Sequence, residues 1–168
     1  MFRIGEKIIY GSTGICEVED ITHLQMDGID RNKLYYLLIP MNERKGKIYT
    51  PTDNAKVKMR RILTKEEAES LVDEIKGIEQ LGVAANDKMR EEKYKETLKT
   101  CDCREWIKMI KTLYLRKQDL ISNGKKLSNT DEKYLKQAED RLYSELSVAL
   151  DIDKDGMVKY IQEKVHSK

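Results

Sequence analysis

The chain has 168 residues, with 32 Lys and Arg against 30 Asp and Glu, and 37% of its side chains are charged. This share exceeds the roughly 25% of an average domain, so most of the surface must be ionised. No apolar run approaches the about 20 residues of a membrane helix, and the first residues lack the pattern of a signal peptide. We expect neither a membrane nor a secreted protein, but one domain or two small ones.

The three cysteines support a cytoplasmic location. Cys16, Cys101 and Cys103 are an odd number, and two of them are only one residue apart. This is no disulfide framework, and free thiols are typical of the reducing cytoplasm. Cys101 and Cys103 could form half of a metal site, but only His23 and His166 are available as imidazole ligands. We favour small residues at a helix start, and predict no metal ion and no cofactor.

Residues 1–62 show the patterns of β-strands separated by turns. The apolar run 33–39 ends at Pro40 and is the strongest strand signal. Cys16 and Val18 alternate with acidic residues, which predicts that they share a buried face. We expect further strands around 8–10, 15–21 and 47–50, and turns at 11–14, 27–28 and 43–46. Four or five short strands favour a small barrel over an open sheet, because closure removes unpaired edges.

From Leu63 onward the apolar period is helical. The first four predicted helix starts carry a capping residue: Thr64 with Glu67 in a capping box, Asn86 or Asp87, Asp102 with Glu105, and Ser128 with Asp131. The predicted apolar stripes are Ala68, Leu71, Val72 and Ile75; Met89, Tyr94 and Leu98; Trp106, Met109, Ile110, Leu113 and Tyr114; Leu135, Ala138, Leu142, Leu146 and Leu150; and Val158, Ile161 and Val165. The sequence therefore predicts an α+β fold, with a small β-barrel over 1–62 and a compact domain of about five helices over 63–168.

Catalytic arrangements are hard to assemble from this chain. Neither histidine stands in a nucleophile–histidine–acid pattern, and phosphate-binding glycine loops are absent from the sequence. We predict no enzyme and no small-molecule substrate. The segment 151–156 resembles the opening of a calcium-binding EF-hand loop, but Gln162 stands where a bidentate carboxylate is needed. The alternative interpretation is an acidic linker whose aspartates cap the last helix.

Charge is unevenly distributed along the helical half. Residues 88–117 hold ten basic and five acidic side chains, whereas residues 65–79 hold two basic and six acidic ones. Residues 63–168 as a whole carry a net charge of −1, so the domain fails the global test for nucleic-acid binding. The local excess of cations indicates either a patch for phosphates or an ordinary solvated face.

The order of motifs resembles the CarD/CdnL family of bacterial transcription regulators. The resemblance rests on Phe2–Tyr10 with Gly14, on Thr50–Ala55 followed by Arg61, on Tyr94-Lys95, and on Leu127-Ser128 followed by Asp131, Leu135, Ala138, Leu142, Glu145 and Leu146. It covers nearly the whole chain. It implies a Tudor/SH3-like N-terminal barrel, shared with transcription-repair coupling factors, that docks on the β subunit of RNA polymerase. The helical domain is then expected to contact promoter DNA at the upstream edge of the melting bubble and to stabilise the open complex.

Several functional positions depart from the family pattern. Family members commonly place a Trp wedge four residues before the position of Tyr94, and here that position is Arg90, preceded by Met89. Either Arg90 enters the minor groove as a cation or Met89 inserts, while the stripe position of Trp106 indicates a core residue. The resemblance also implies roles for basic positions that match the DNA-facing side, namely Lys95 and Arg116.

The expected polymerase interface also differs from the family pattern. Leu24 and Tyr49 replace two arginines that contact the polymerase in some relatives. We expect Leu24, Lys47 and Tyr49 to bind the polymerase and Met89, Arg90, Lys95 and Arg116 to bind DNA. The missing Trp motivates an alternative, an adaptor that docks on polymerase while its helical domain holds a protein and ignores DNA.

Overall fold

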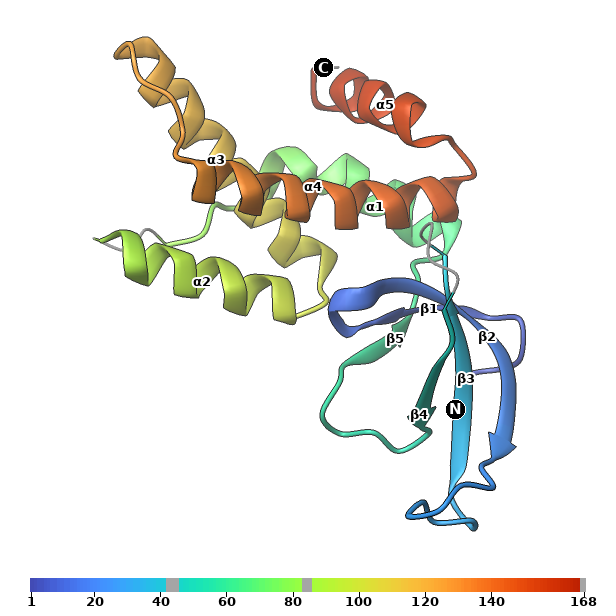
Figure 1. The fold of residues 1–168 in the computed structure, drawn as a ribbon. Helices are drawn as coiled ribbons and strands as arrows, with labels where there is room; N and C mark the ends of the chain where they lie inside the picture. Colours follow the sequence, from blue (N-terminus) through green and yellow to red (C-terminus); the bar gives the residue numbers. More distant parts are fainter. Residues whose placement is uncertain (42–45, 83–85, 167–168) are drawn as a thin grey trace. The chain divides into compact units, whose positions relative to one another are not determined.

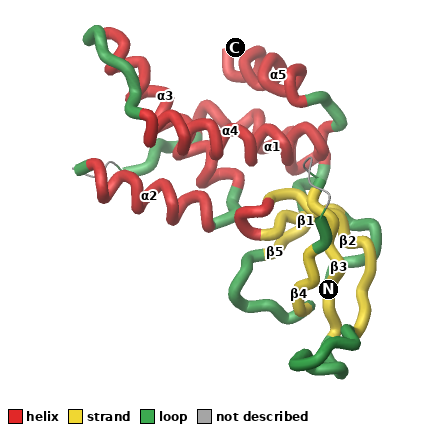
Figure 2. The backbone as a smooth tube through the Cα atoms, viewed as in Figure 1, coloured by secondary structure: helices red, strands yellow, loops and turns green. Residues whose placement is uncertain are grey.

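The computed structural model describes residues 1–41, 46–82 and 86–166 of the chain. For residues 165 and 166 it describes the backbone alone. The chain divides into two compact units, residues 1–62 and 63–168. Figure 2 shows the change of structure, with strands in the first unit and helices in the second. This confirms the predicted α+β fold class.

The first unit, as far as it is described, is one antiparallel sheet of five strands. They are β1 (Lys7–Tyr10), β2 (Gly14–His23), β3 (Leu34–Pro40), β4 (Ile48–Pro51) and β5 (Met59–Arg61), in the order β4-β3-β2-β1-β5 (Figure 1). The predicted turn between β1 and β2 is the short 3-10 helix η1 (Gly11–Thr13). The turn predicted at 43–46 falls mostly outside the described residues.

The core of this unit forms on one face of the curved sheet. Cys16 and Val18 are fully buried, and Glu17 and Glu19 are exposed, which confirms the predicted alternation. The buried cluster consists of Ile8, Cys16, Val18, Tyr36 and Leu38, with Phe2 stacked at its margin on Tyr36. Burial raises the pKa of the Cys16 thiol to about 11.

Strands β1 and β4 are linked by a side-chain contact and not by a ladder. Among the described residues β4 pairs only with β3, and β5 only with β1. The Tyr10 hydroxyl on β1 donates to the Thr50 hydroxyl on β4 (3.3 Å), although two strands separate them in the sheet order. The sheet is therefore curled like the predicted barrel, but within the described part of the chain the expected loss of unpaired edges does not occur, and β4 keeps an outer edge.

The described residues of the second unit form five α-helices. They are α1 (Lys65–Glu74), α2 (Asp87–Lys99), α3 (Cys103–Ser122), α4 (Asn129–Leu150) and α5 (Lys154–His166), with the 3-10 helix η2 (Ile75–Gly77) after α1. Helix α4 contacts all four others and is the centre of the unit. The predicted apolar stripe of α4 is buried, as are Trp106, Met109 and Leu113 of α3.

Most predicted helix starts are capped as expected. Thr64 and Glu67 form the capping box, and the side chains of Asn86 and Ser128 accept from backbone N–H groups of the first turn. Asp102 caps α3 by accepting from the Arg104 N–H instead of pairing with Glu105 in a box.

Three apolar residues that periodicity assigned to the core are exposed instead. Met89 is 52% exposed, Tyr114 is 53% exposed, and Val158 is 37% exposed. On α5 the core position next to Val158 is taken by the fully buried Met157, with Ile161 one turn later. Helical spacing identifies an apolar position, but only the neighbouring helices decide whether it is covered. The predicted core residue Val165 lies outside the described side chains.

Candidate functional site

The outer edge of β4 is the candidate surface of the first unit. Tyr49 lies opposite Leu37 in the pairing with β3 and is 46% exposed, and Lys47, just before the strand, is also exposed. Thr50 points to the other face and is buried, where it accepts from Tyr10 and from the Asn54 side chain (2.9 Å). This inner anchoring fixes the strand, so its edge is a rigid template for a further strand.

Leu24 does not join the other two candidate residues at this edge. It follows the end of β2, where His23 pairs with Leu34, whereas Tyr49 pairs with Leu37 farther along β3. Its side chain is 9% exposed. Leu24 is thus a nearly buried residue at the end of the sheet, and of the three candidates Lys47 and Tyr49 are the exposed ones.

The candidate surface of the second unit is the outward face of α2. Tyr94, Thr97 and Leu98 are buried on its inner side. The exposed side carries four lysines and two glutamates around Met89, namely Lys88, Glu92, Lys93, Lys95, Glu96 and Lys99. Neither Lys88 nor Lys93 has a side-chain ion pair among the residues that the structure describes. These lysines belong to the basic segment 88–117, but no motif along the sequence marks them individually.

Arg90 turns away from this face. Its side chain is only 14% exposed and forms an ion pair with Asp87 one turn earlier. Its Nε is buried and has no hydrogen-bond partner among the described residues. Burial raises the pKa of the neighbouring Tyr94, with Asp131 adding to the rise and the charges of Arg90 and Arg116 opposing it. Arg90 is therefore held against the helical core, beside Tyr94.

Lys95 and Arg116 are both paired with carboxylates, but in different surroundings. The Lys95 Nζ lies 3.4 Å from Glu91, and their side chains are 56% and 38% exposed. The Arg116 Nε donates to Asp131 (3.1 Å), whose side chain is 9% exposed. An exposed pair contributes about 0–1 kcal/mol, so Lys95 is able to exchange Glu91 for a phosphate. Arg116 would leave a nearly buried carboxylate without a partner.

A hollow of about 420 Å³ lies between the starts of α2 and α4. It brings Arg90 and Lys95 together with Ser128 and Thr130 at the start of α4. Its charged lining consists of the carboxylates of Asp87, Glu91, Glu92 and Asp131 and the cations of Lys88, Arg90 and Lys95. With four carboxylates against three cations, the hollow does not favour an anion. The exposed side of α2 shares Lys88, Glu92 and Lys95 with the hollow but adds Lys93 and Lys99 against Glu96, so it is the better surface for phosphates.

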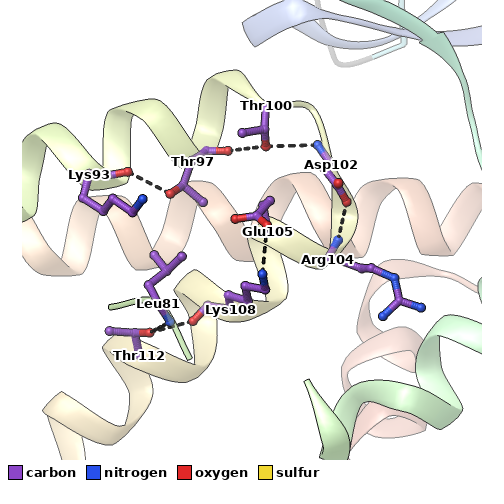
Figure 3. Close-up of polar contacts among 9 residues, drawn as sticks. All are labelled: Leu81, Lys93, Thr97, Thr100, Asp102, Arg104, Glu105, Lys108 and Thr112. Carbon is purple, nitrogen blue, oxygen red and sulfur yellow. Dashed lines mark hydrogen bonds and ion pairs between the residues drawn. The ribbon is translucent and has the colours of Figure 1, made fainter. Parts of the chain in front are cut away.

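The corner between α2 and α3 fixes the direction of α2 (Figure 3). The Thr97 hydroxyl donates to the Lys93 carbonyl (2.8 Å), and the Thr100 hydroxyl donates to the Thr97 carbonyl (2.7 Å) and accepts from the Asp102 N–H (3.3 Å). Cys101 adopts a left-handed backbone (φ 55). These contacts tie the end of α2 to the cap of α3, so the exposed face of α2 has a defined orientation within its unit.

The cysteines of this corner are part of the packing. Cys101 and Cys103 are buried, and the Cys103 thiol donates to the buried carboxyl of Glu145 (3.3 Å). No cluster of three or more His, Cys, Asp or Glu suited to a metal occurs within 1–41, 46–82 and 86–164. In the EF-hand-like segment, the Asp153 carboxylate accepts from the Gly156 N–H (2.6 Å) and caps α5, as the alternative interpretation expected.

Two family models match this chain. The model of the CarD-like/TRCF RID domain matches residues 2–63, and that of the CarD C-terminal domain matches residues 78–162. No curated protein matches the chain. No helix in the described part of the chain is long and apolar enough to cross a membrane. The two matches cover both units, and the chain belongs to the CarD/CdnL family of transcription regulators that interact with RNA polymerase.

Proposed function

We propose that the chain docks on the β subunit of RNA polymerase through strand β4, and that its helical unit contacts promoter DNA at the upstream edge of the melting bubble. This contact stabilises the open complex. The family supports polymerase interaction and a regulatory role without catalysis. The single observation that carries the DNA part is the outward face of α2, where Met89 is exposed on the same side as four lysines and two glutamates.

The docking proposal rests on the edge of β4. A sheet edge binds an added strand through main-chain hydrogen bonds, while side chains along the edge provide specificity. Tyr49 and Lys47 are the exposed side chains at this edge. Tyr49 offers a large apolar area together with a hydroxyl, which suits an interface from which an arginine is missing. Leu24 supports the end of β2 from within the unit.

For the DNA contact, Met89 is the better of the two substitutes for the family's Trp. An apolar side chain that enters a partly unstacked base step stabilises the bubble edge, and Met is one of the residues used in this way. Met89 is exposed, whereas Arg90 is held inward by Asp87. We therefore assign insertion to Met89 and positioning of the first turn of α2 to Arg90.

Lys95 is proposed to contact phosphate after leaving Glu91, and Arg116 to act by holding the start of α4 in place. Weak DNA affinity suffices for this function, because docking of the first unit holds the helical unit near the promoter at high effective concentration.

The lifetime of open complexes formed by purified polymerase holoenzyme tests both parts. Tyr49→Ala should abolish the effect of the chain by preventing docking, and Met26→Ala, another exposed apolar residue of the first unit, should not. Met89→Ser should leave docking intact and shorten the lifetime by a factor of about five, the equivalent of about 1 kcal/mol. Unchanged lifetimes with both Tyr49→Ala and Met89→Ser would contradict the proposal.

A second candidate function is an adaptor whose helical unit binds a protein and not DNA. It is favoured by the pairing of Arg90, Lys95 and Arg116, three of the residues expected to bind DNA, with carboxylates of their own unit. Footprinting of a promoter complex separates the two functions. Protection that is identical with the full chain and with residues 1–62 alone would favour the adaptor.

A further inference from the structure

Helix α3 carries an apolar stripe that continues past the end of its covered region. Ile107 is fully buried and Ile110 is partly buried, but Tyr114 and Ile121 on the same face are 53% and 57% exposed. Leu115, on the neighbouring face, is 44% exposed. Figure 1 shows that the last turns of α3 extend beyond the other helices of the unit. We name Tyr114, Leu115 and Ile121 the α3-end surface.

This end of the helix is rigid. Arg116 and Lys117 form ion pairs with Asp131 and Glu132 on the first turn of α4. The helix ends in a Schellman motif, in which the Lys125 N–H donates to the Leu120 carbonyl (2.7 Å) and the Gly124 N–H to the Ile121 carbonyl (3.0 Å). Gly124 has the positive φ of 73° that this motif requires. The exposed apolar side chains are therefore presented by a fixed backbone, which reduces the entropy lost on binding.

Of the basic side chains around the α3-end surface, Lys111, Arg116 and Lys117 are held by backbone carbonyls or carboxylates of the same unit, so its cationic rim consists of Lys125 and Lys126. Residues 111–126 contain five basic side chains and one acidic side chain, Asp119. Lys125 and Lys126, in the loop after the helix, are exposed and have no ion pair with any residue that the structure describes. An apolar area with a cationic rim is complementary to an apolar area with an anionic rim.

We propose that the α3-end surface binds an acidic amphipathic helix of a partner protein. A helix laid against α3 would extend the apolar contacts that Ile107 and Ile110 make inside the unit, since helices pack by interlocking rows of side chains. The occupant needs apolar residues at helical spacing opposite Tyr114, Leu115 and Ile121, and glutamates or aspartates facing Lys125 and Lys126. This goes beyond the contacts with polymerase β subunit and promoter DNA, because it involves neither β4 nor the outward face of α2.

A designed peptide probes this chemistry directly. The probe is a helical peptide with Leu at positions i, i+3, i+4 and i+7 and Glu elsewhere, compared with the same peptide carrying Lys in place of Glu. Titration of the full-length, ¹⁵N-labelled chain should shift the amide signals of residues 110–126 with the acidic peptide and leave them unchanged with the basic one.

Variants locate the binding and keep the test independent of folding. Tyr114→Ser with Ile121→Ser should weaken binding of the acidic peptide by about tenfold or more, and both sites are more than half exposed, so the thermal unfolding temperature should stay the same. Lys125→Glu with Lys126→Glu should reverse the preference in favour of the basic peptide. The control Lys65→Ala with Lys159→Ala removes two exposed lysines elsewhere and should change nothing.

Three results would overturn the proposal. The first is that the acidic peptide causes no shifts at millimolar concentration, or shifts that map elsewhere. The second is that a short DNA duplex shifts the same amides and competes with the peptide, which would make the surface a phosphate-binding one. The third is that the shifts grow with the concentration of the chain alone, which would make a second copy the occupant.

Discussion

Some charged side chains of the helical unit point inward and are bonded within the unit, whereas others point outward into solvent. Glu145 and Asp131 face inward, where one accepts from the Leu63 N–H (2.9 Å) and the other holds Arg116. Lys88 and Lys93 face outward and have no ion pair in the described part of the chain. The inward groups stabilise the unit and the outward groups are available to other molecules. The net charge of a segment therefore overstates the charge that it offers to a ligand.

The largest effect is expected for the inward group, at Glu145. Glu145→Ala leaves a cavity in the core and removes the acceptor of the Leu63 N–H, because the carboxyl is fully buried. We expect a loss of about 2–4 kcal/mol in the free energy of unfolding, measured by urea denaturation. Glu145→Gln keeps an acceptor of nearly the same size and should lose less. Equal losses for the two variants would show that the hydrogen bond to Leu63 contributes nothing.

In the first unit, the buried thiol of Cys16 is an inward-facing titratable group. Its pKa of about 11 in the folded chain exceeds the usual 9.0, so the unfolded chain releases the thiol proton first as the pH rises. The protonated thiol therefore contributes its full share to the free energy of unfolding below about pH 9. This share decreases as the pH rises through about 11, and the total loss is about 2–3 kcal/mol.

The difference in unfolding free energy between the wild type and Cys16→Ala measures this contribution. It should be constant from pH 6 to 8 and shrink above pH 9, while the other titrating groups cancel in the comparison. A difference that stays constant up to pH 11 would mean that the thiol ionises equally easily in both states.

Arg116→Ala is expected to have a smaller effect on stability, because one end of its ion pair is partly exposed. The Asp131 carboxylate is nearly buried, so the loss of its partner should destabilise the unit by about 1–2 kcal/mol. Adding Asp131→Asn should recover part of this loss, since no uncompensated charge then remains. A double-mutant cycle from thermal unfolding measures the coupling energy between Arg116 and Asp131. If the effects of the two substitutions simply add, the ion pair does not stabilise the unit.

These contrasts show what the sequence could and could not reveal. The capping residue Thr64 and the buried pair Cys16 and Val18 follow from local spacing, and the structure confirms them. The inward position of Arg116 depends on Asp131, which lies fifteen residues away on another helix. A pattern along one helix contains no signal for such a partner.

Glu145 shows the same limit. Its position within the α4 stripe could have marked it as an inward residue, because it precedes Leu146 and follows Leu142 by three. Its partners, Leu63 and Cys103, are distant in sequence. For Met89 and Tyr114 the prediction was wrong in the opposite sense. Their apolar spacing predicted burial, but no neighbouring helix covers them.

The smallest effect on stability, and the largest on DNA binding, is expected for the outward group. Lys88→Ala with Lys93→Ala should change the free energy of unfolding by less than about 0.5 kcal/mol, because both side chains are exposed. If both contact phosphates, the slope of log affinity against log salt for the promoter complex should fall by up to about 1.8, which is about 0.9 for each contact. The matched control, Lys65→Ala with Lys159→Ala, removes the same charge from other parts of the unit and should leave the slope unchanged. An equal decrease with both pairs would mean that DNA senses only the net charge, and no decrease with either would favour the adaptor. Because the variants differ in the position of the charge and not in its amount, the measurement separates a defined DNA-binding face of α2 from general electrostatic attraction.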